Sequence, residues 1–101
     1  MWLFVVFDLP MESSAEKKAY RLFRKQLCCL GFSLVQRSVY RRWADHKMHA
    51  ERIIKKLKNT FPARGDVMIF KLPHAVFQHC ESFDGVLQLP LPQPPSPWQI
   101  I

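Results

Sequence analysis

The sequence lacks any apolar run near the roughly 20 residues that a membrane-spanning helix requires, and it holds only 3 glycines in 101 residues. The apolar stretch at residues 2–7 follows no basic segment and is interrupted at Asp8-Leu9-Pro10. We therefore expect no signal peptide and no membrane partner. Aromatic residues make up 13% of the chain, which argues against a disordered basic tail protein and favours one folded domain.

Cysteine is also sparse, and the count of three is odd. Cys28 and Cys29 are adjacent and cannot form an ordinary disulfide with each other, so a reduced, cytoplasmic setting fits best. Neither a C-x-x-C pattern nor an identifiable base accompanies this pair. We interpret both thiols as structural.

Acidic residues are few, with 8 against 15 lysines and arginines, and the formal net charge is +7. A polyanion is therefore the first partner to consider. The basic residues are spread over the predicted helices and strands and form no juxtamembrane cluster. Nucleic acid consequently matches this charge better than a membrane surface does.

The apolar run at residues 2–7 predicts a strand buried on both faces. Pro10 cannot donate a ladder hydrogen bond, so the strand ends near it. Asp8 is thereby placed at the carboxyl end of a core strand. Ligands and chemistry collect at that edge in open α/β sheets.

Two amphipathic helices are predicted. The first begins at a capping box formed by Ser13 and Glu16 and ends at Gly31, and the second runs from about His46 to Asn59 with Asp45 as its N-cap. The apolar arc of the first helix is Ala15, Ala19, Tyr20, Leu22, Phe23, Leu27 and Leu30, and that of the second is Ala50, Ile53, Ile54 and Leu57.

Strands at 2–8, 32–36, 38–43 and 67–72 complete the order βαββαβ. This order predicts an α+β, ferredoxin-like fold: an antiparallel four-stranded sheet with two helices on one face. The strands at 2 and 67 carry the most apolar residues and are assigned to its middle. Because the second face lacks helices, a homodimer through the sheets is expected. The link near residue 37 is either a tight turn or a bulge in one bent strand.

Residues 1–85 form the predicted ferredoxin-like domain, and residues 86–101, with five of the eight prolines, form a proline-rich carboxyl-terminal tail. A short helical turn is expected at about 75–78 and a minor strand at 81–83. Residues 86–89 could add one strand to a sheet edge. The tail beyond them either docks on a partner as an extended peptide or is disordered.

Several motifs stand in an order that one known family shares. They are Phe-Val-Val-Phe-Asp-Leu-Pro at 4–10, Glu-Lys-Lys-Ala-Tyr-Arg-Leu-Phe-Arg-Lys at 16–25, Gly-Phe at 31–32, Gln-Arg-Ser-Val-Tyr at 36–40 and Lys-Lys-Leu-Lys at 55–58. Through them, about residues 1–72 resemble the CRISPR-associated protein two family, the small core protein of spacer acquisition. The region after Phe83 follows no pattern that matches it.

The resemblance implies a symmetric homodimer in the CRISPR adaptation complex. Such a dimer binds double-stranded DNA, with RNA as the other nucleic acid to consider, and bridges two dimers of the CRISPR integrase subunit. The resemblance also implies a Mg²⁺-dependent endonuclease activity with Asp8 as the catalytic and metal-binding residue.

Chemistry allows two interpretations of Asp8. Two Asp8 side chains brought together by a two-fold axis would make a shared Mg²⁺ site able to activate water. Alternatively, Asp8 only ends the strand and caps the Leu9-Pro10 turn. Glu12, Glu16 and Asp45 are further carboxylates, but no sequence pattern places them nearby.

A cationic helix face with neighbouring arginines is predicted to contact a phosphate backbone without reading bases. The candidate nucleic-acid-binding residues are Lys17, Lys18, Arg21, Arg24, Lys25, Arg37, Arg41 and Arg42. Ser38 and Tyr40 either reach a phosphate or lie on the sheet surface. His46, His49, His74, His79 and Cys80 lack a metal-site spacing, and we interpret the histidines as surface residues.

Two other functions remain open from the sequence. One is a free-standing, metal-dependent endoribonuclease of toxin type. The other is a ferredoxin-like RNA binder that stacks bases on Phe4, Phe7 and Phe70 of its open sheet face. Dimerisation distinguishes the RNA binder from the dimeric scaffold, because a base-stacking module needs the open sheet face free, whereas the dimer covers it.

Overall fold

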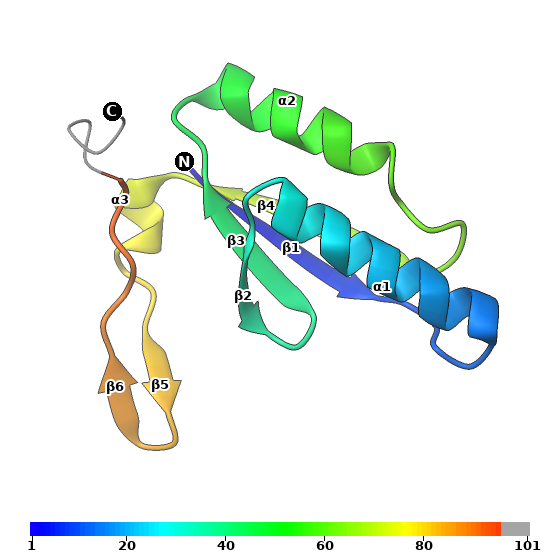
Figure 1. Cartoon of the computed structure of the whole chain (residues 1–101). Helices are drawn as coiled ribbons and strands as arrows, with labels where there is room; N and C mark the ends of the chain where they lie inside the picture. The colour runs from blue at the N-terminus through cyan, green and yellow to red at the C-terminus, as the bar shows by residue number, and fades with distance from the viewer. Residues whose placement is uncertain (96–101) are drawn as a thin grey trace.

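The computed structural model describes residues 1–95 and contains a four-stranded antiparallel sheet with two helices on one face (Figure 1). The elements are β1 (Trp2–Asp8), α1 (Ser14–Cys29), β2 (Ser33–Gln36), β3 (Val39–Trp43), α2 (Lys47–Lys58), β4 (Asp66–Leu72), α3 (His74–Phe77), β5 (Ser82–Asp84) and β6 (Leu87–Leu89). The predicted α+β, ferredoxin-like arrangement is confirmed. A turn at 37–38 separates β2 from β3, and their register also shifts between Leu34 and Gln36, so the turn and the irregularity are both present.

The core lies between the sheet and the helices, because alternate residues of β1 face the helix layer. Leu3, Val5 and Phe7 are buried there, and Tyr40 of β3, directly opposite Val5, joins them. The helices add Tyr20, Phe23 and Leu27 from α1 and Ala50, Ile53, Ile54 and Leu57 from α2. The predicted apolar face of α2 is therefore confirmed in full.

Both ends of α1 are set by the local sequence, as predicted. The Ser13 hydroxyl accepts from the Glu16 N–H at 3.1 Å, and the Glu16 carboxylate accepts from the Ser13 N–H at 2.9 Å, which completes the capping box. Mainly because of the Ser13 N–H bond, the pKa of Glu16 is lowered. At the other end Gly31 has φ of 85°, and the Phe32 N–H donates to the Leu27 carbonyl, a Schellman closure that glycine adopts without strain.

The predicted apolar face of α1 is too wide. Leu22 is 56% exposed, and Ala15 is exposed as well. The buried positions 20, 23 and 27 form a narrow stripe, because only that side of α1 meets the core. Leu22 lies outside this contact.

We expect Ser13→Ala to lower the free energy of unfolding by about 1 kcal/mol, because the Glu16 N–H loses its acceptor. Urea denaturation at pH 7 measures this change. Because the pKa of Glu16 is lowered from its ordinary value of 4.5, its carboxylate stabilises the fold at pH values above 4.5, and this contribution is lost as pH falls through the folded-state pKa. The control for Ser13→Ala is Ser14→Ala, at the first helical position. An equal loss of unfolding free energy in both variants would contradict the capping role of Ser13.

The N-cap of α2 differs from the prediction. His46, and not Asp45, caps the helix, and its Nδ1 accepts from the His49 N–H at 3.1 Å. The Asp45 N–H instead donates to His49 Nδ1 at 3.1 Å. An imidazole nitrogen thus fills the acceptor position that a carboxylate was predicted to fill.

The strand order is β2-β3-β1-β4, so β4 lies at an edge and its predicted middle position is wrong. The β2–β3 hairpin places β3 beside β1, and β4 pairs only with β1 on the other side. Val67 and Ile69 pack against the core, while Met68 and Phe70 point to the opposite face. There they are 58% and 44% exposed. Strand β4 is therefore apolar on both sides without being central.

The sheet face away from the helices, here called the open face, carries Phe4, Met68 and Phe70 and is only partly covered. The predicted short helix forms as α3 and places Phe77 against Trp2 and Phe4, with ring centroids 4.9 and 5.8 Å apart. Within residues 1–95, no helix covers the part of the open face around Met68 and Phe70.

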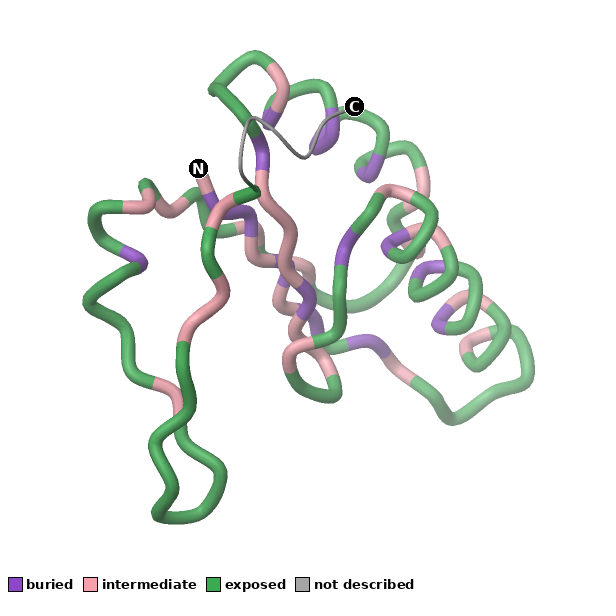
Figure 2. Tube along the Cα trace, turned by 60° about the vertical axis from the view of Figure 1, so that its left-hand side comes forward, coloured by how far each residue is buried: buried purple, intermediate pink, exposed green. Residues whose placement is uncertain are grey.

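Strands β5 and β6 form a hairpin that pairs with no other strand of residues 1–95. The minor strand at 81–83 is confirmed as β5, but residues 86–89 do not extend the main sheet. Figure 1 shows the hairpin extending away from the body, and Figure 2 shows that it is exposed along nearly its whole length. No helix among the described residues is long and apolar enough to cross a membrane.

Candidate functional site

Asp8 is the exposed last residue of β1, at the strand end predicted for it. Its partner in register is Asp66, the first residue of β4. Directly opposed residues of antiparallel strands have Cβ atoms about 4.5–5.5 Å apart and on the same face. The two carboxylates therefore leave the sheet side by side.

Gly65 brings these two strand ends together. Its φ is 104°, and a Cβ atom there would lie 2.8 Å from the Asp8 carbonyl oxygen and 2.7 Å from Leu9 Cδ2. Only glycine tolerates both this backbone conformation and this approach. The turn before β4 thus fixes Asp66 opposite Asp8.

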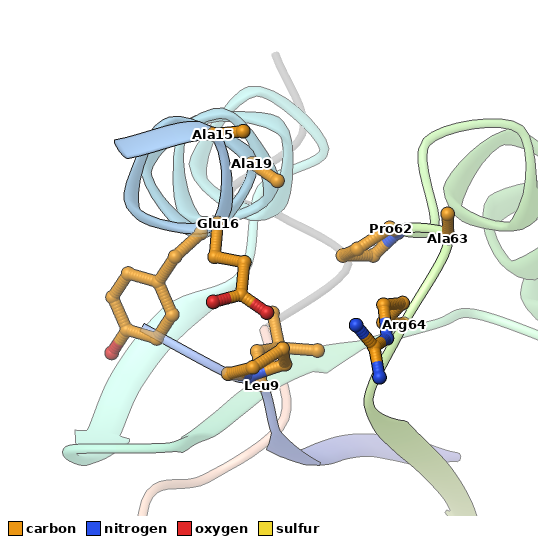
Figure 3. Close-up of a pocket in the computed structure, with 9 residues that line it drawn as sticks. Leu9, Ala15, Glu16, Ala19, Pro62, Ala63 and Arg64 are labelled. Atoms are coloured by element: carbon orange, nitrogen blue, oxygen red, sulfur yellow. The ribbon is translucent and has the colours of Figure 1, made fainter. Parts of the chain in front are cut away.

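An open depression surrounds the pair. It is lined by Asp8, Asp66, Glu12, Glu16 and Arg64, so the fold brings together two glutamates that the sequence pattern could not place. Figure 3 shows the adjoining pocket between α1 and residues 62–64, which shares Glu16 and Arg64 with this depression; the Glu16 carboxylate lies next to Leu9 there. Asp45, the other carboxylate considered, lies near His49 at the far end of the sheet and lines a different depression.

The donor set of this depression suits Mg²⁺ in type, and its opposed carboxylates are Asp8 and Asp66. Mg²⁺ takes one or two carboxylates and keeps several waters, which matches the opposed Asp8 and Asp66. Like charges directly opposite each other across two strands repel, so a cation between them would relieve that repulsion. No group of three or more His, Cys, Asp or Glu residues within 1–95 is placed to hold a metal ion.

The cationic face of α1 is as predicted. Its members, all exposed, are Lys17, Lys18, Arg21, Arg24 and Lys25. Among the described residues the one ion-pair contact is His49 with Asp45, at 3.8 Å between Nδ1 and Oδ2, so no carboxylate neutralises this face. Unpaired cations on one helix face are the pattern expected for contact with a phosphate backbone.

Tyr40 links this face to the core. Its ring is buried, which neither prediction for it anticipated, and its hydroxyl accepts a hydrogen bond from Arg24 Nε at 3.0 Å. This bond raises the pKa of Arg24, whose guanidinium also lies over the Tyr20 ring at 5.7 Å. Tyr40 also lines a depression together with Arg21 and Lys25. Arg24 is thus held in place, whereas Arg21 and Lys25 make no hydrogen bond or ion pair within the described chain.

The other three candidate arginines do not join the cationic face of α1. Arg37 is exposed in the turn between β2 and β3, near the Asp8 end of β1. Arg41 is opposite Phe4 and so belongs to the open face, where burial lowers its pKa. Arg42 points to the helix side and donates to the Leu30 carbonyl at 2.6 Å. Because side chains alternate along β3, Arg41 and Arg42 lie on opposite faces of the sheet, although the sequence analysis grouped them as one binding surface.

The structure also shows where the cysteine and histidine residues singled out in the sequence lie. Cys28 and Cys29 are both free and exposed, so neither belongs to the buried core. His46 and His79 are exposed, while His49 and His74 are half-buried, and His74 Nδ1 accepts from Trp2 Nε1 at 3.3 Å.

The base-stacking triad of the RNA-binder reading is not assembled on one face. Phe7 is buried on the helix side, and Phe4 lies partly beneath Phe77. Only Phe70 of the three is exposed on the open face.

Comparisons with known proteins agree with this fold and these motifs. The family model described as CRISPR associated protein Cas2 matches residues 1–80. A relative from Parvibaculum lavamentivorans, named CRISPR-associated endoribonuclease Cas2, is 34% identical over 100 residues, covering 99% of both chains. A relative of the same name from Ligilactobacillus salivarius is 45% identical over 67 residues, or 66% of each chain.

A solved structure supports the fold independently. The crystal structure of Streptococcus pyogenes Cas2 at pH 6.5 superposes with a TM-score of 0.63 at 21% identity, covering 83% of this chain and 100% of that one. With a family model that spans four-fifths of the sequence, these comparisons establish that the chain belongs to the Cas2 family of CRISPR-associated proteins.

Proposed function

We propose that this chain acts in spacer acquisition as a homodimer that binds duplex DNA along its backbone and bridges two dimers of the CRISPR integrase subunit. The observation that carries the proposal is a pair of opposite surfaces on one small domain. One is the cationic face of α1, which has no carboxylate partner in residues 1–95, and the other is the incompletely covered open face. One surface suits a polyanion, and the other suits a second copy.

The homodimer is supported by the apolar open face. Met68 and Phe70 would each expose a large apolar side chain to water in a monomer. A patch of this kind on a small domain is typical of an interface. Two-fold pairing of identical faces covers both copies at once.

Duplex binding is supported by the chemistry of the cationic face. Its lysines and arginines offer charge and N–H donors but no arrangement for reading base edges. A two-fold axis would double the face into a longer strip. For a protein that binds such a duplex, we expect a cytoplasmic location.

Mg²⁺-dependent cleavage at Asp8 is a further part of the proposal. Asp8 and Asp66 would hold the ion, which would supply an activated water at a phosphodiester. The relatives named endoribonuclease favour a ribonuclease as the second candidate function. One chain supplies few donors, however, so a binding and bridging role agrees better with the geometry than an independent nuclease does.

Asp66→Asn tests the paired carboxylates. Without Mg²⁺ we expect the variant to be more stable than the wild type by about 0.2–1 kcal/mol, because two opposed like charges become one. Added Mg²⁺ should raise the wild-type melting temperature and leave that of Asp66→Asn nearly unchanged. Glu12→Gln, in the same depression but outside the opposed pair, is the control. An equal response to Mg²⁺ in all three proteins would rule out the Asp8–Asp66 site.

Assembly with the integrase subunit tests the main proposal. The chain is mixed with its cognate integrase subunit and a short duplex, and the mass of the complex is measured by light scattering. We expect one homodimer of this chain with two integrase dimers and one duplex. A mass that contains no copy of this chain would refute the bridging role.

A further inference from the structure

We propose that a notch between the end of α1 and one side of α2 binds a phosphate group. The notch has a volume of about 340 Å³ and is lined by Arg42, His49, Arg52 and Lys56, with no aspartate or glutamate among its lining residues. This site is additional to the proposed function, because it requires neither the cationic face of α1 nor the integrase subunit.

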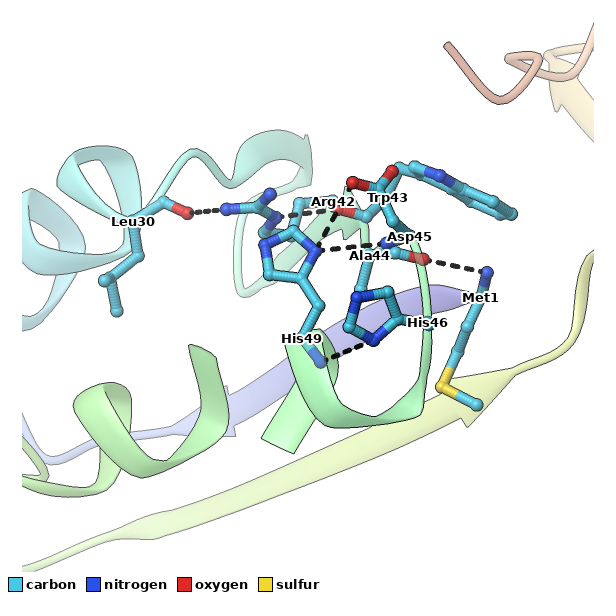
Figure 4. A network of polar contacts seen from close by, with 8 residues as sticks. All are labelled: Met1, Leu30, Arg42, Trp43, Ala44, Asp45, His46 and His49. Atoms are coloured by element: carbon cyan, nitrogen blue, oxygen red, sulfur yellow. Dashed lines mark hydrogen bonds and ion pairs between the residues drawn. The ribbon is translucent and has the colours of Figure 1, made fainter. Parts of the chain in front are cut away.

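Arg42 is held in a fixed orientation in this notch. Its Nε donates to the Trp43 carbonyl at 2.8 Å and its Nη1 to the Leu30 carbonyl at 2.6 Å (Figure 4). A guanidinium has five N–H donors, so three are left for a ligand. A planar donor group that is already ordered suits a tetrahedral oxyanion. The bond to Leu30 also neutralises the C-terminal end of α1, which would otherwise repel an anion.

His49 adds a second directed donor. Its Nδ1 accepts from the Asp45 N–H, so in the neutral imidazole the proton resides on Nε2. Figure 4 shows the His49 ring next to the Arg42 guanidinium. Arg52 and Lys56 stand one helical turn apart on α2, both exposed and both without an ion pair in residues 1–95. The notch therefore presents donors and positive charge from β3 and α2 together.

The surroundings of His49 give the site a measurable signature. The charged and titratable groups around it are Arg42 of β3, Cys29 of α1, Arg52 and Lys56 of α2, and Asp45 and His46 before the helix. Burial lowers the pKa of His49. The charges of Arg42 and Arg52 lower this pKa further, whereas the carboxylate of Asp45 raises it. A bound anion would favour the imidazolium, so the pKa of His49 must rise on binding, and protonation must in turn tighten binding.

The test is an NMR pH titration of the His49 ring in the full chain. The probe is inorganic sulfate, which mimics phosphate but keeps its charge across the histidine range, compared with sodium chloride at equal ionic strength. We expect sulfate to raise the pKa of His49 by about one unit, equivalent to about tenfold tighter binding to the protonated form. An unchanged titration would overturn the site.

Two matched double variants locate the effect. Arg52→Gln with Lys56→Gln removes two charges from the notch, and we expect the sulfate-induced shift to be lost. Lys55→Gln with Lys58→Gln removes the same charge from the same helix outside the notch, and the shift should remain. Equal shifts in both double variants would show general ion screening and would also overturn the proposal.

Oligonucleotide arms then identify the source of the phosphate. A short strand with a 5′-phosphate is compared with the same strand without it. A shift with both supports a backbone diester, a shift with only the phosphorylated strand supports a strand terminus, and a shift with sulfate alone supports a free anion. Because sulfate binding does not depend on duplex binding, failure of the proposed function and failure of this site are distinguishable.

Discussion

Phe70→Glu is expected to convert the proposed homodimer into a monomer at micromolar concentration. Phe70 lies opposite Phe4 on the open face and is 44% exposed in the single chain. Fully burying a phenylalanine side chain contributes about 1.5–3 kcal/mol, so covering the 44% that is still exposed contributes roughly 0.7–1.3 kcal/mol. A two-fold interface contains Phe70 twice, and losing both contributions raises the dimer dissociation constant by about 10–10²-fold. Analytical ultracentrifugation over a range of concentrations measures this constant.

Leu34→Glu is the matched control for this experiment. Leu34 is 56% exposed on edge strand β2, but its partner in register is Tyr40, whose side chain faces the helices. A charge there should leave the dimer constant unchanged. If Leu34→Glu dissociates the dimer and Phe70→Glu does not, the interface is not the open face. Circular dichroism of both variants checks that the monomer still folds.

Neutralising the cationic face of α1 is expected to produce the largest effect on duplex binding. The variant combines Arg21→Gln with Lys25→Gln, because neither side chain makes a hydrogen bond or ion pair in the described chain. Each phosphate contact contributes about 0.9 to the slope of log affinity against log salt, so the slope should fall by about 1.8 per protomer. Fluorescence anisotropy with a labelled duplex at several salt concentrations measures the slope.

Arg24 is unchanged in the double variant of Arg21 and Lys25. It donates to the Tyr40 hydroxyl and so stabilises the fold as well as carrying charge. The control is Lys55→Gln with Lys58→Gln on α2, which changes the net charge equally. The same loss of slope in both variants would mean that total charge, and not the α1 face, governs binding.

The features of this protein that could be predicted from sequence are those set by local interactions. The capping box at Ser13, the helix end at Gly31 and the apolar stripe of α2 depend on residues a few positions apart. Their spacing therefore predicts them directly. Leu22 was misplaced because amphipathic periodicity gives the direction of the core but not the width of the contact.

The position of β4 could not be predicted from its composition. A strand that is apolar on both faces is either a central strand or an edge strand with one exposed apolar face. Strand β4 is the second kind, because it lies at the edge and Met68 and Phe70 are exposed, and both kinds have the same sequence pattern.

Part of the candidate site was predictable in principle. Asp66 becomes the partner of Asp8 once Val67 is paired with Phe7, but that register is a long-range property. The separation of Arg41 from Arg42 onto opposite faces follows from the two-residue period of a strand. That signal was present in the sequence, and grouping the arginines by charge alone overlooked it.

The most direct test of the proposed role is integration in vitro. The cognate integrase subunit, a short duplex and a supercoiled plasmid that carries the repeat are incubated without this protein, with the wild type, with Asp8→Asn or with Phe70→Glu. We predict integration with the wild type and Asp8→Asn, and loss of integration with Phe70→Glu, because bridging requires the dimer and not the carboxylate. Full integration without this protein, or with the monomeric variant, would contradict the bridging role.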